Sequence, residues 1–391
     1  MTMKKYLADH VDTLPPSGIR KFFDLVATMK DVISLGVGEP DFTTPWTVRE
    51  SGIFSLEQGQ TMYTSNAGIF ELRDEISHHL SKTMGLSYNP LDEILITTGA
   101  SEAVDLVMRA VLEQGDVVLV PDPSYVSYAP CAILSGASVS FVPTLAKDDF
   151  RLRVEELEKV YTPKAKLLVL SYPNNPTGAI MTREDLLPIA EFVEKHDLLV
   201  LTDDIYCDLT YDGTHVSFAS LPGMRDRTLY INGFSKSYAM TGWRIGYVAG
   251  NTHLIGGMTK IHQYTMLCAP IMGQISALEA LRSASDAKNE MVNEYDRRRR
   301  LMVHGFRQMG LDCFEPLGAF YVFPDISKTK LSSVEFSEEL LKAEMVAVVP
   351  GTAFGPSGEG HIRCSYAYSI EQLQEALKRI ARFVEQRLAS L

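Results

Sequence analysis

The sequence predicts an α/β protein built on a mostly parallel sheet. Seven short apolar runs lie between residues 92 and 250, and several are separated by segments with apolar residues at helical spacing, such as 103–112 and 186–193. Alternating strand and helix patterns are typical of folds in which helices cover a parallel sheet. The seven runs expected to form the strands are 94–98, 117–120, 139–142, 167–170, 198–202, 228–231 and 247–249.

The pattern changes after about residue 290, which predicts a second, smaller α+β domain. Segments of helical spacing there are 295–309, 333–343 and 370–389, and strand-like segments are 318–324, 346–349 and 361–366. We expect residues 47–290 to form the large domain. Residues 1–46, with a helix-like arm and a short strand at 32–35, should join residues 291–391 in the small domain.

Composition and charge exclude some classes of partner. The 391 residues are 46% hydrophobic and 22% charged, enough for a large core, and the formal net charge is −12. The one basic cluster, residues 297–300, follows Glu294 and Asp296 in a helix-like segment, so we expect a solvated, ion-paired face. An acidic chain without a basic stripe is a poor match to nucleic acid or to an anionic membrane.

The cysteines and the N-terminus indicate the compartment. Five cysteines are scattered without a CxxC motif, so we expect reduced thiols and no metal site. Residues 1–6 lead into Asp9 and Asp12 and not into an apolar segment, which is unlike a signal peptide. No apolar run approaches the roughly 18 residues of a membrane helix. We therefore expect a soluble cytoplasmic protein.

Polar groups follow several predicted strands, at the edge where parallel sheets bind ligands. Gly99-Ala100-Ser101 precedes a helical segment and suits a phosphate, although Ser101 could equally act as a local helix cap. In residues 171–178, two prolines and a glycine make a rigid turn that either fixes Asn175 as a hydrogen-bonding group or is only a turn.

Charged residues follow two further strands. Asp203 and Asp204 follow the run 198–202. A carboxylate at the end of a buried strand is costly to bury unless it is paired. Because successive strand residues face opposite sides, the two should not share a role. Lys236 lies between two serines, with Arg244 eight positions later. Lys236 is therefore either a buried amine, which would be a good nucleophile, or an ordinary loop lysine.

These groups together match the needs of one cofactor, pyridoxal 5′-phosphate (PLP). PLP requires a lysine for a Schiff base, a phosphate site and an acid that keeps its pyridine nitrogen protonated. The protonated ring accepts the electrons left when a bond to the substrate Cα breaks. Arginine, with its planar fork, suits either the cofactor phosphate or a substrate carboxylate.

Six motifs carry a resemblance to a known family: GVGEPDF, NNPTG, DDIY, GFSKSYAMTGWRIGY, GAFYVFP and GHIRCSYA, in this order along nearly the whole chain. In this combination the sequence resembles a fold-type I PLP-dependent aminotransferase of the class I/II family. The most similar subgroup contains aromatic, aspartate and N-acetyl-diaminopimelate aminotransferases. The resemblance implies the PLP-dependent transferase fold and transamination between an L-amino acid and a 2-oxo acid such as 2-oxoglutarate.

The resemblance also implies a role for each matching residue around the cofactor ring. Lys236 matches the lysine that forms the Schiff base and moves the proton at the substrate Cα. Asp203, and not Asp204, matches the partner of the pyridine nitrogen, while Tyr206 and Asn175 match donors to the phenolic oxygen. The aromatic residue stacked on the ring would be Tyr125, which could otherwise be an ordinary core aromatic.

The remaining implied roles concern the phosphate, the substrate and a partner subunit. Arg363 matches the arginine that binds the substrate α-carboxylate, with help from Asn175 and the backbone near Gly38. Tyr63 matches a tyrosine that the family contributes from the neighbouring subunit, so a homodimer is implied. The phosphate site would be formed by Ala100, Ser101, Ser235 and Arg244.

One departure from the family affects the choice of substrate. Members dedicated to dicarboxylates often have an arginine just before the segment that matches residues 268–270, whereas residues 260–265 contain none. Tyr264, Lys260 or groups that move would then recognise the distal end of the substrate. This favours an aromatic or broad amino donor. Aspartate and N-acetyl-LL-diaminopimelate are the alternatives, because 2-oxoglutarate must still fit.

Two other functions are compatible with this fold. A PLP-dependent C–S β-lyase would share the motifs, which do not separate elimination from transamination. A non-catalytic regulator usually carries an added DNA-binding domain, and neither the length nor the charge of this chain leaves room for one.

Overall fold

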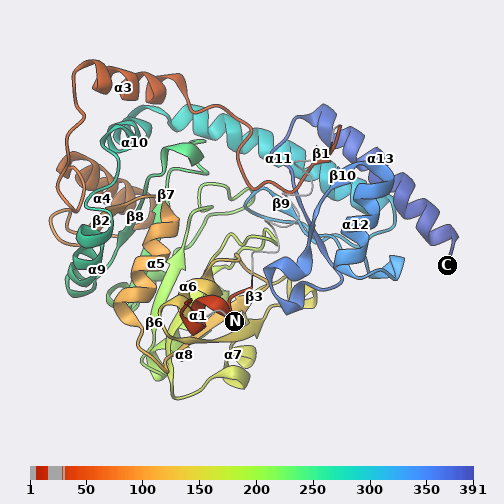
Figure 1. Ribbon diagram of the computed structural model, residues 1–391, viewed down its shortest axis with the longest axis horizontal. Helices are drawn as coiled ribbons and strands as arrows, with labels where there is room; N and C mark the ends of the chain where they lie inside the picture. Colours follow the sequence, from red (N-terminus) through yellow and green to blue (C-terminus); the bar gives the residue numbers. More distant parts are fainter. Residues whose placement is uncertain (1–5, 16–28, 30) are drawn as a thin grey trace.

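The computed structural model describes residues 6–15, 29 and 31–391. Its main feature is a seven-stranded sheet in the order β2-β8-β7-β6-β5-β3-β4, in which only β8 runs antiparallel to its neighbours (Figure 1). All seven predicted runs are strands of this sheet, which confirms the predicted fold class. The strands are β2 (Ile94–Thr97), β3 (Val117–Asp122), β4 (Ser138–Pro143), β5 (Ala165–Leu170), β6 (Leu199–Asp203), β7 (Thr228–Gly233) and β8 (Gly246–Ala249).

Helices cover both faces of the sheet, which explains why its central strands are continuously apolar. Side chains alternate between the two faces: Leu95 packs with α5 and α9, whereas Ile94 and Ile96 pack with α4 and α10. Near β5, helices α7 and α8 complete the second face. The helices beside the large sheet are α4 (Phe70–Met84), α5 (Ala100–Val111), α6 (Tyr128–Leu134), α7 (Val154–Val160), α8 (Arg183–Lys195), α9 (Thr252–Thr265) and α10 (Ile271–Ser283).

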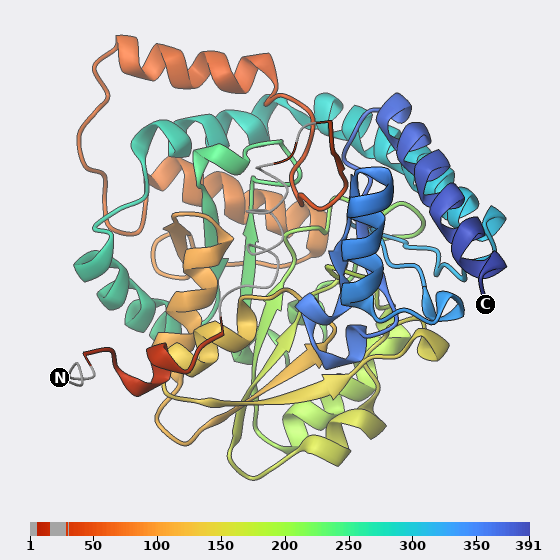
Figure 2. The same cartoon turned by 45° about the vertical axis from the view of Figure 1, so that its right-hand side comes forward.

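The C-terminal part builds a second core beside the sheet (Figure 2). Strands β9 (Tyr321–Val322), β12 (Ile362–Ser365) and β11 (Val349–Pro350) form a small antiparallel sheet. The N-terminal strand β1 (Ile33–Ser34) pairs with β10 (Val346–Ala347), which joins the two ends of the chain. The surrounding helices are α11 (Ser285–Gln308), α12 (Ser333–Glu344) and α13 (Ile370–Ala389).

The domain boundary proposed at residue 290 falls inside α11, a long helix that runs from the large sheet to the small one (Figure 1). The proposed division of the chain stays a prediction. Apart from α1 (Asp9–Asp12) and a few neighbouring residues, the predicted N-terminal arm lies outside the described residues. Helix α3 (Trp46–Glu57) packs on α10 at the periphery of the molecule.

The basic cluster at 297–300 corrects one prediction. Arg297 and Arg300 are exposed, but Arg298 and Arg299 are buried, so the expectation of a solvated face was wrong for these two. Consecutive residues are spread around a helix with 3.6 residues per turn, so four in a row cannot all face solvent. Arg298 binds both carboxylate oxygens of Asp41, at 2.8 and 2.9 Å, and thereby joins α11 to the turn at residues 36–42.

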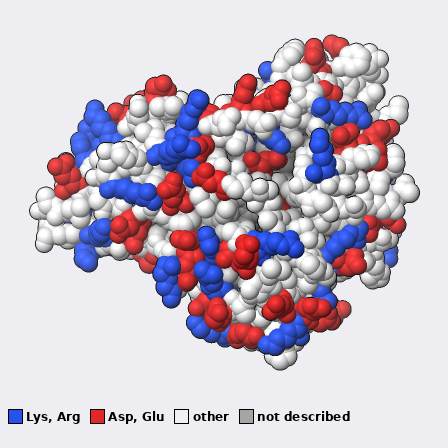
Figure 3. Space-filling model, turned by 180° about the vertical axis from the view of Figure 1, so that it is seen from behind, with Lys and Arg blue, Asp and Glu red and all other residues white. Residues whose placement is uncertain are grey.

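The remaining observations concern surface charge, membrane helices, metal sites and cysteines. On the face shown in Figure 3, acidic and basic side chains are interspersed. Within the described ranges, no helix is both long and apolar enough to cross a membrane. The same residues contain no cluster of histidine, cysteine, aspartate and glutamate suited to a metal ion. All five cysteines are free thiols.

Candidate active site

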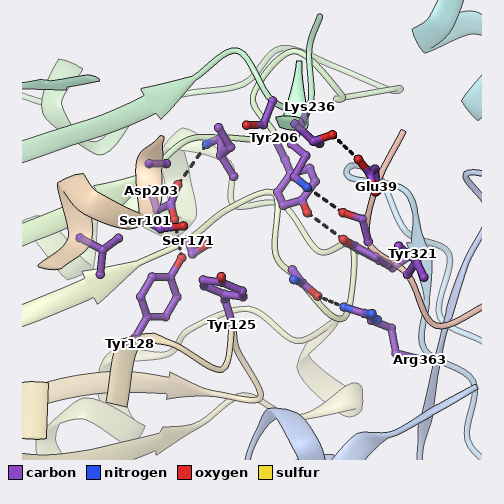
Figure 4. Close-up of a pocket in the computed structure, with 18 of the residues that line it drawn as sticks. Glu39, Ser101, Tyr125, Tyr128, Ser171, Asp203, Tyr206, Lys236, Tyr321 and Arg363 are labelled. Atoms are coloured by element: carbon purple, nitrogen blue, oxygen red, sulfur yellow. Dashed lines mark hydrogen bonds between the residues drawn. The ribbon is translucent and has the colours of Figure 1, made fainter. Parts of the chain in front are cut away.

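A cavity of about 470 Å³ lies at the carboxyl edge of the large sheet. Loops that follow β2, β5, β6 and β7 form one wall, and Tyr321 of β9 and Arg363 of β12 close the other side (Figure 4). Because these parallel strands end at one edge, the loops meet although they are distant in sequence. The predicted residues that line the cavity are Gly38, Ala100, Ser101, Tyr125, Asn175, Asp203, Tyr206, Ser235, Lys236, Arg244 and Arg363.

Lys236 projects into this cavity from the loop after β7. Its Nζ donates a hydrogen bond to the Gly38 carbonyl at 2.7 Å. Burial lowers the pKa of its amine from 10.5 to about 8; Glu39 opposes this shift, while Arg363 and Arg244 add to it. Desolvation disfavours the charged form of an amine, so an appreciable fraction of Lys236 is neutral near pH 7. A neutral buried amine is a nucleophile and a base.

Asp203 ends β6 and is buried beside the cavity. The Tyr128 hydroxyl donates to its Oδ2 at 2.7 Å, and the Ile205 amide donates to its Oδ1 at 3.3 Å (Figure 4). Burial raises the pKa of this carboxyl from 3.8 to about 6, although both hydrogen bonds favour the charged form. A buried carboxylate gains most from a cation, so this position suits a protonated ring nitrogen.

Asp204 points to the other side of the sheet, as the alternation of a strand predicts. It accepts a hydrogen bond from the Thr202 hydroxyl at 2.7 Å and lies 2.7 Å from Nε2 of His215. It does not line the cavity. The two neighbouring carboxylates therefore have separate surroundings.

The far end of the cavity is suited to a carboxylate. Arg363 is buried, and its Nη1 donates to the Asn175 side-chain oxygen at 2.9 Å while its Nη2 donates to the Gly36 carbonyl. The buried Nε has no protein partner. The guanidinium lies over the Tyr321 ring, 4.4 Å from its centroid. A planar guanidinium held in this way can bind a carboxylate through two parallel hydrogen bonds.

The opposite end is suited to a phosphate. Ala100 and Ser101 begin α5, whose first amides lack helical partners and attract anions. Arg244 lies against Gly99, where an added Cβ would approach its Nη2 to 2.5 Å and displace the guanidinium. Gly99 also has a φ of 78°, which glycine adopts without strain. Helix amides, hydroxyl groups and a guanidinium together form a site for a phosphate monoester.

The donor set as a whole fits PLP. The cavity offers an amine of lowered pKa, a buried carboxyl that lacks a cation, a phosphate site and a tyrosine ring at its side, Tyr125. These are the groups that the cofactor requires.

The lining also contains residues that the sequence did not indicate, among them Glu39, Tyr128 and Tyr321. The sequence spacing could have indicated Tyr128, because it lies three residues after Tyr125 at the start of a helix. The two rings make an edge-to-face contact with centroids 5.5 Å apart. Tyr321 lies in the GAFYVFP motif, which identified the segment but not the side chain.

Three other predicted residues do not line the cavity of this chain. Tyr63 is 82% exposed in the loop between α3 and α4. Lys260 and Tyr264, proposed for the distal end of the substrate, lie on α9 and are absent from the lining.

Replacing Asp203 by asparagine should stabilise the protein without cofactor at neutral pH. Because the folded-state pKa is raised from 3.8 to about 6, the folded state holds the proton more tightly, and stability falls as the pH rises through this window. At pH values above this window, the free energy of unfolding is lower by roughly 3 kcal/mol. Asp203→Asn carries no such charge, so its urea midpoint should exceed that of the parent protein at pH 7 and the difference should narrow toward pH 4.

Asp204→Asn is the matched control, since Asp204 has a hydrogen-bonded histidine partner and should gain no stability at neutral pH. A contrary result would be urea midpoints of Asp203→Asn and the parent protein that differ by the same amount at every pH. That result would contradict the assignment of a buried carboxylate that destabilises the folded protein when charged.

Comparison with known proteins agrees with the cavity chemistry. The family model for aminotransferase class I and II matches residues 30–380. The chain is 45% identical to an aspartate aminotransferase of Pyrococcus abyssi and 44% identical to aromatic-amino-acid aminotransferase 2 of Thermococcus litoralis, each over 384 residues that cover 97% of this chain and 99% of the relative. The crystal structure of an aromatic aminotransferase from Pyrococcus horikoshii superposes with a TM-score of 0.91 at 46% identity, covering 94% of this chain and 99% of that one.

These matches extend over nearly the whole chain at identities that leave no doubt about descent. The solved structure also agrees with the α/β fold described above. The chain therefore belongs to the class I and II aminotransferases, a family of enzymes that use PLP.

Proposed function

We propose that the protein transfers the amino group of an aromatic L-amino acid, or of a broad range of L-amino acids, to a 2-oxo acid such as 2-oxoglutarate. One observation carries the proposal: a single cavity contains an amine with a pKa of about 8 and, at its far end, an arginine with an unpartnered buried Nε. An amino acid bound by its carboxylate at Arg363 would place its Cα near Lys236.

The cofactor would be held by residues of this one cavity and supplies, when bound, an electron-accepting ring for the breaking of a Cα–H bond. Lys236 would hold it covalently, Asp203 would pair with its ring nitrogen, and Tyr125 would stack on its face. Tyr206 and Asn175 would donate to its phenolic oxygen. Its phosphate would be bound by Ala100, Ser101, Ser235 and Arg244.

Lys236 is proposed to move the proton at the substrate Cα. A base works best when its pKa lies near the working pH, and burial brings this amine to about 8. The hydrogen bond to the Gly38 carbonyl shows that the side chain reaches across the cavity to the turn at residues 36–39. To reach the substrate Cα, the amine would have to leave this hydrogen bond.

The preference for an aromatic or broad donor is supported by the charges of the lining. Of the described arginines, Arg244 and Arg363 line the cavity, and both have proposed partners in the cofactor phosphate and the α-carboxylate. Among the residues that the structure describes, no further arginine lines the cavity and could bind a distal carboxylate. Aromatic rings of Tyr125 and Tyr321 line the space instead. Two relatives that are nearly equally identical to this chain are named as an aspartate aminotransferase and an aromatic-amino-acid aminotransferase. Overall similarity therefore does not decide the substrate.

A homodimer is proposed from the surface around Tyr63. Large apolar side chains are exposed together there: Trp46, Ile53, Phe54 and Leu56 on α3, with Met62, Tyr63, Met266 and Leu267 nearby in the fold. A groove of about 820 Å³ beside α3 shares Glu39, Thr241, Gly242 and Arg244 with the active cavity. Exposed apolar areas of this kind mark protein interfaces, so a second copy seated here would reach the active cavity.

Replacing Lys236 by alanine should abolish turnover. Without the amine, the cofactor cannot be held covalently and the Cα proton has no base, so we expect turnover to fall by at least about 10²–10⁴-fold. The visible absorbance of the lysine-bound cofactor should also be lost. Lys342→Ala removes an exposed lysine of α12, outside the cavity, and serves as the matched control. Normal turnover of Lys236→Ala would refute the role of Lys236.

A half-reaction screen should identify the substrate class. The PLP-loaded protein is mixed with single amino acids, without a 2-oxo acid, and conversion of the bound cofactor to its amino form is followed by absorbance. We expect tyrosine and phenylalanine to react faster than aspartate, because within the described ranges no arginine of the cavity is left for a distal carboxylate. Glutamate, alanine, lysine and N-acetyl-LL-diaminopimelate complete the series.

Other results of this screen would favour other functions. Faster conversion by aspartate or by N-acetyl-LL-diaminopimelate would replace the aromatic proposal. Pyruvate and ammonia released from cysteine-type substrates without any 2-oxo acid would indicate a C–S β-lyase. Absence of reaction with every amino acid would contradict transamination.

Mixing two inactive chains should test the dimer and Tyr63 together. Tyr63→Ala and Lys236→Ala proteins are each expected to be impaired. If Tyr63 acts in the neighbouring subunit, a mixed dimer has one site with both residues intact, so unfolding and refolding a mixture should recover activity. Light scattering would report the dimer directly. Failure to recover activity in a mixture shown to contain mixed dimers would contradict the role of Tyr63 across the interface.

A further inference from the structure

Tyr321 contacts three residues of the proposed site. Its hydroxyl lies 2.8 Å from that of Tyr206, and the Arg363 guanidinium lies 4.4 Å from its ring centroid (Figure 4). A Cβ added to Gly38 would lie 2.3 Å from the Tyr321 hydroxyl, so this turn fits only with glycine. One buried side chain thus touches a proposed cofactor ligand, a proposed substrate ligand and the turn that accepts the Lys236 hydrogen bond.

The position of Tyr321 is set by packing and by its strand. Its backbone pairs with Ser365 of β12, two residues after Arg363. Its ring packs against Phe320, with centroids 4.8 Å apart, and edge-on against Tyr206 at 5.9 Å. Because the ring is held on several sides, its hydroxyl has little freedom, and Tyr206 is the polar side chain with which it is paired.

The direction of the hydrogen bond between the two phenols follows from the hydrogens available. The two oxygens lie 2.8 Å apart, a distance at which either phenol can be the donor. Each hydroxyl carries one hydrogen, so it can donate once while it accepts. If Tyr206 donates its hydrogen to the cofactor, as proposed above, it must accept from Tyr321.

We propose that Tyr321 is a positioning residue, whose hydroxyl donates to the Tyr206 oxygen and directs the hydrogen of Tyr206 into the cavity. The inference rests on the proposed role of Tyr206 as a donor to the phenolic oxygen of the cofactor. A hydroxyl that accepts a hydrogen bond is a stronger donor, because hydrogen bonds in a chain polarise one another. Removing the Tyr321 hydroxyl should therefore weaken the hydrogen bond that Tyr206 makes.

The test uses Tyr321→Phe in the PLP-loaded protein. This variant keeps the ring beneath Arg363 and removes only the hydroxyl. The measurement is the pKa at which the visible absorbance of the bound cofactor changes, because donors to the phenolic oxygen favour the deprotonated form. We expect this pKa to rise by about half to one unit, the size of one hydrogen bond. KM for the amino acid should change little, because Arg363 keeps its support.

A double variant separates a chain of hydrogen bonds from two independent effects. Tyr206→Phe alone should raise the pKa further than Tyr321→Phe does. Tyr206→Phe/Tyr321→Phe should match Tyr206→Phe, because Tyr321 acts only through Tyr206. Shifts that add, or no shift in Tyr321→Phe, would overturn the inference. If Tyr206→Phe itself leaves the pKa unchanged, the proposed role of Tyr206 fails, which is a different outcome.

Two further variants test whether a shift in the pKa of the bound cofactor comes from a general loosening of the core. Tyr366→Phe removes a buried hydroxyl that donates to the Ala319 carbonyl at 3.1 Å, outside the cavity lining, and should leave the pKa unmoved. An equal shift in Tyr366→Phe would overturn the inference. A fluorinated tyrosine incorporated at position 321 is a more acidic donor, so it should lower the pKa of the bound cofactor. A merely structural role would not produce shifts of opposite sign in these two replacements of Tyr321.

Discussion

Desolvation of Lys236 and Asp203 at one edge of one sheet is the constraint on which the rest of the site depends. It brings the pKa of the amine to about 8 and that of the carboxyl to about 6, so both groups lie near their protonation midpoints at neutral pH. Lys236 follows β7 and Asp203 ends the neighbouring β6, and these two strands run parallel. The buried charges cost stability in the protein alone, and a bound cofactor would offset that cost.

The two arginines of the cavity have separate surroundings, which supports separate tasks. Arg244 lies beside Gly99 and the start of α5, where the protein offers a concentration of N–H groups to an anion. Arg363 comes from the small sheet and meets Asn175 of the loop that follows β5 in the large sheet. The carboxylate site is therefore built by both parts of the chain. The ion pair of the buried Arg298 with Asp41 links α11 to the turn at residues 36–42.

The shared chemistry explains why relatives with different substrate names resemble this chain equally. Proton transfer at Cα needs an amine, a carboxylate and a phosphate site whatever the amino acid. Contacts to the distal end of the substrate are made by other side chains and vary without disturbing the reaction. The proposed preference therefore rests on the charges and aromatic rings of this cavity, and on what a second copy would add from the surface around Tyr63.

The sequence by itself determined the α/β class, the strands and most of the proposed site, because strand periodicity and strand-end loops are local patterns. It placed Lys236, Asp203 and Arg363 together through its motifs. Only the tertiary structure placed Tyr128 on Asp203 and Tyr321 on Tyr206, since these contacts join residues 75 and 115 positions apart. It also buried Arg299, against expectation. Such contacts depend on how helices and strands pack, and no local pattern in the chain encodes that packing.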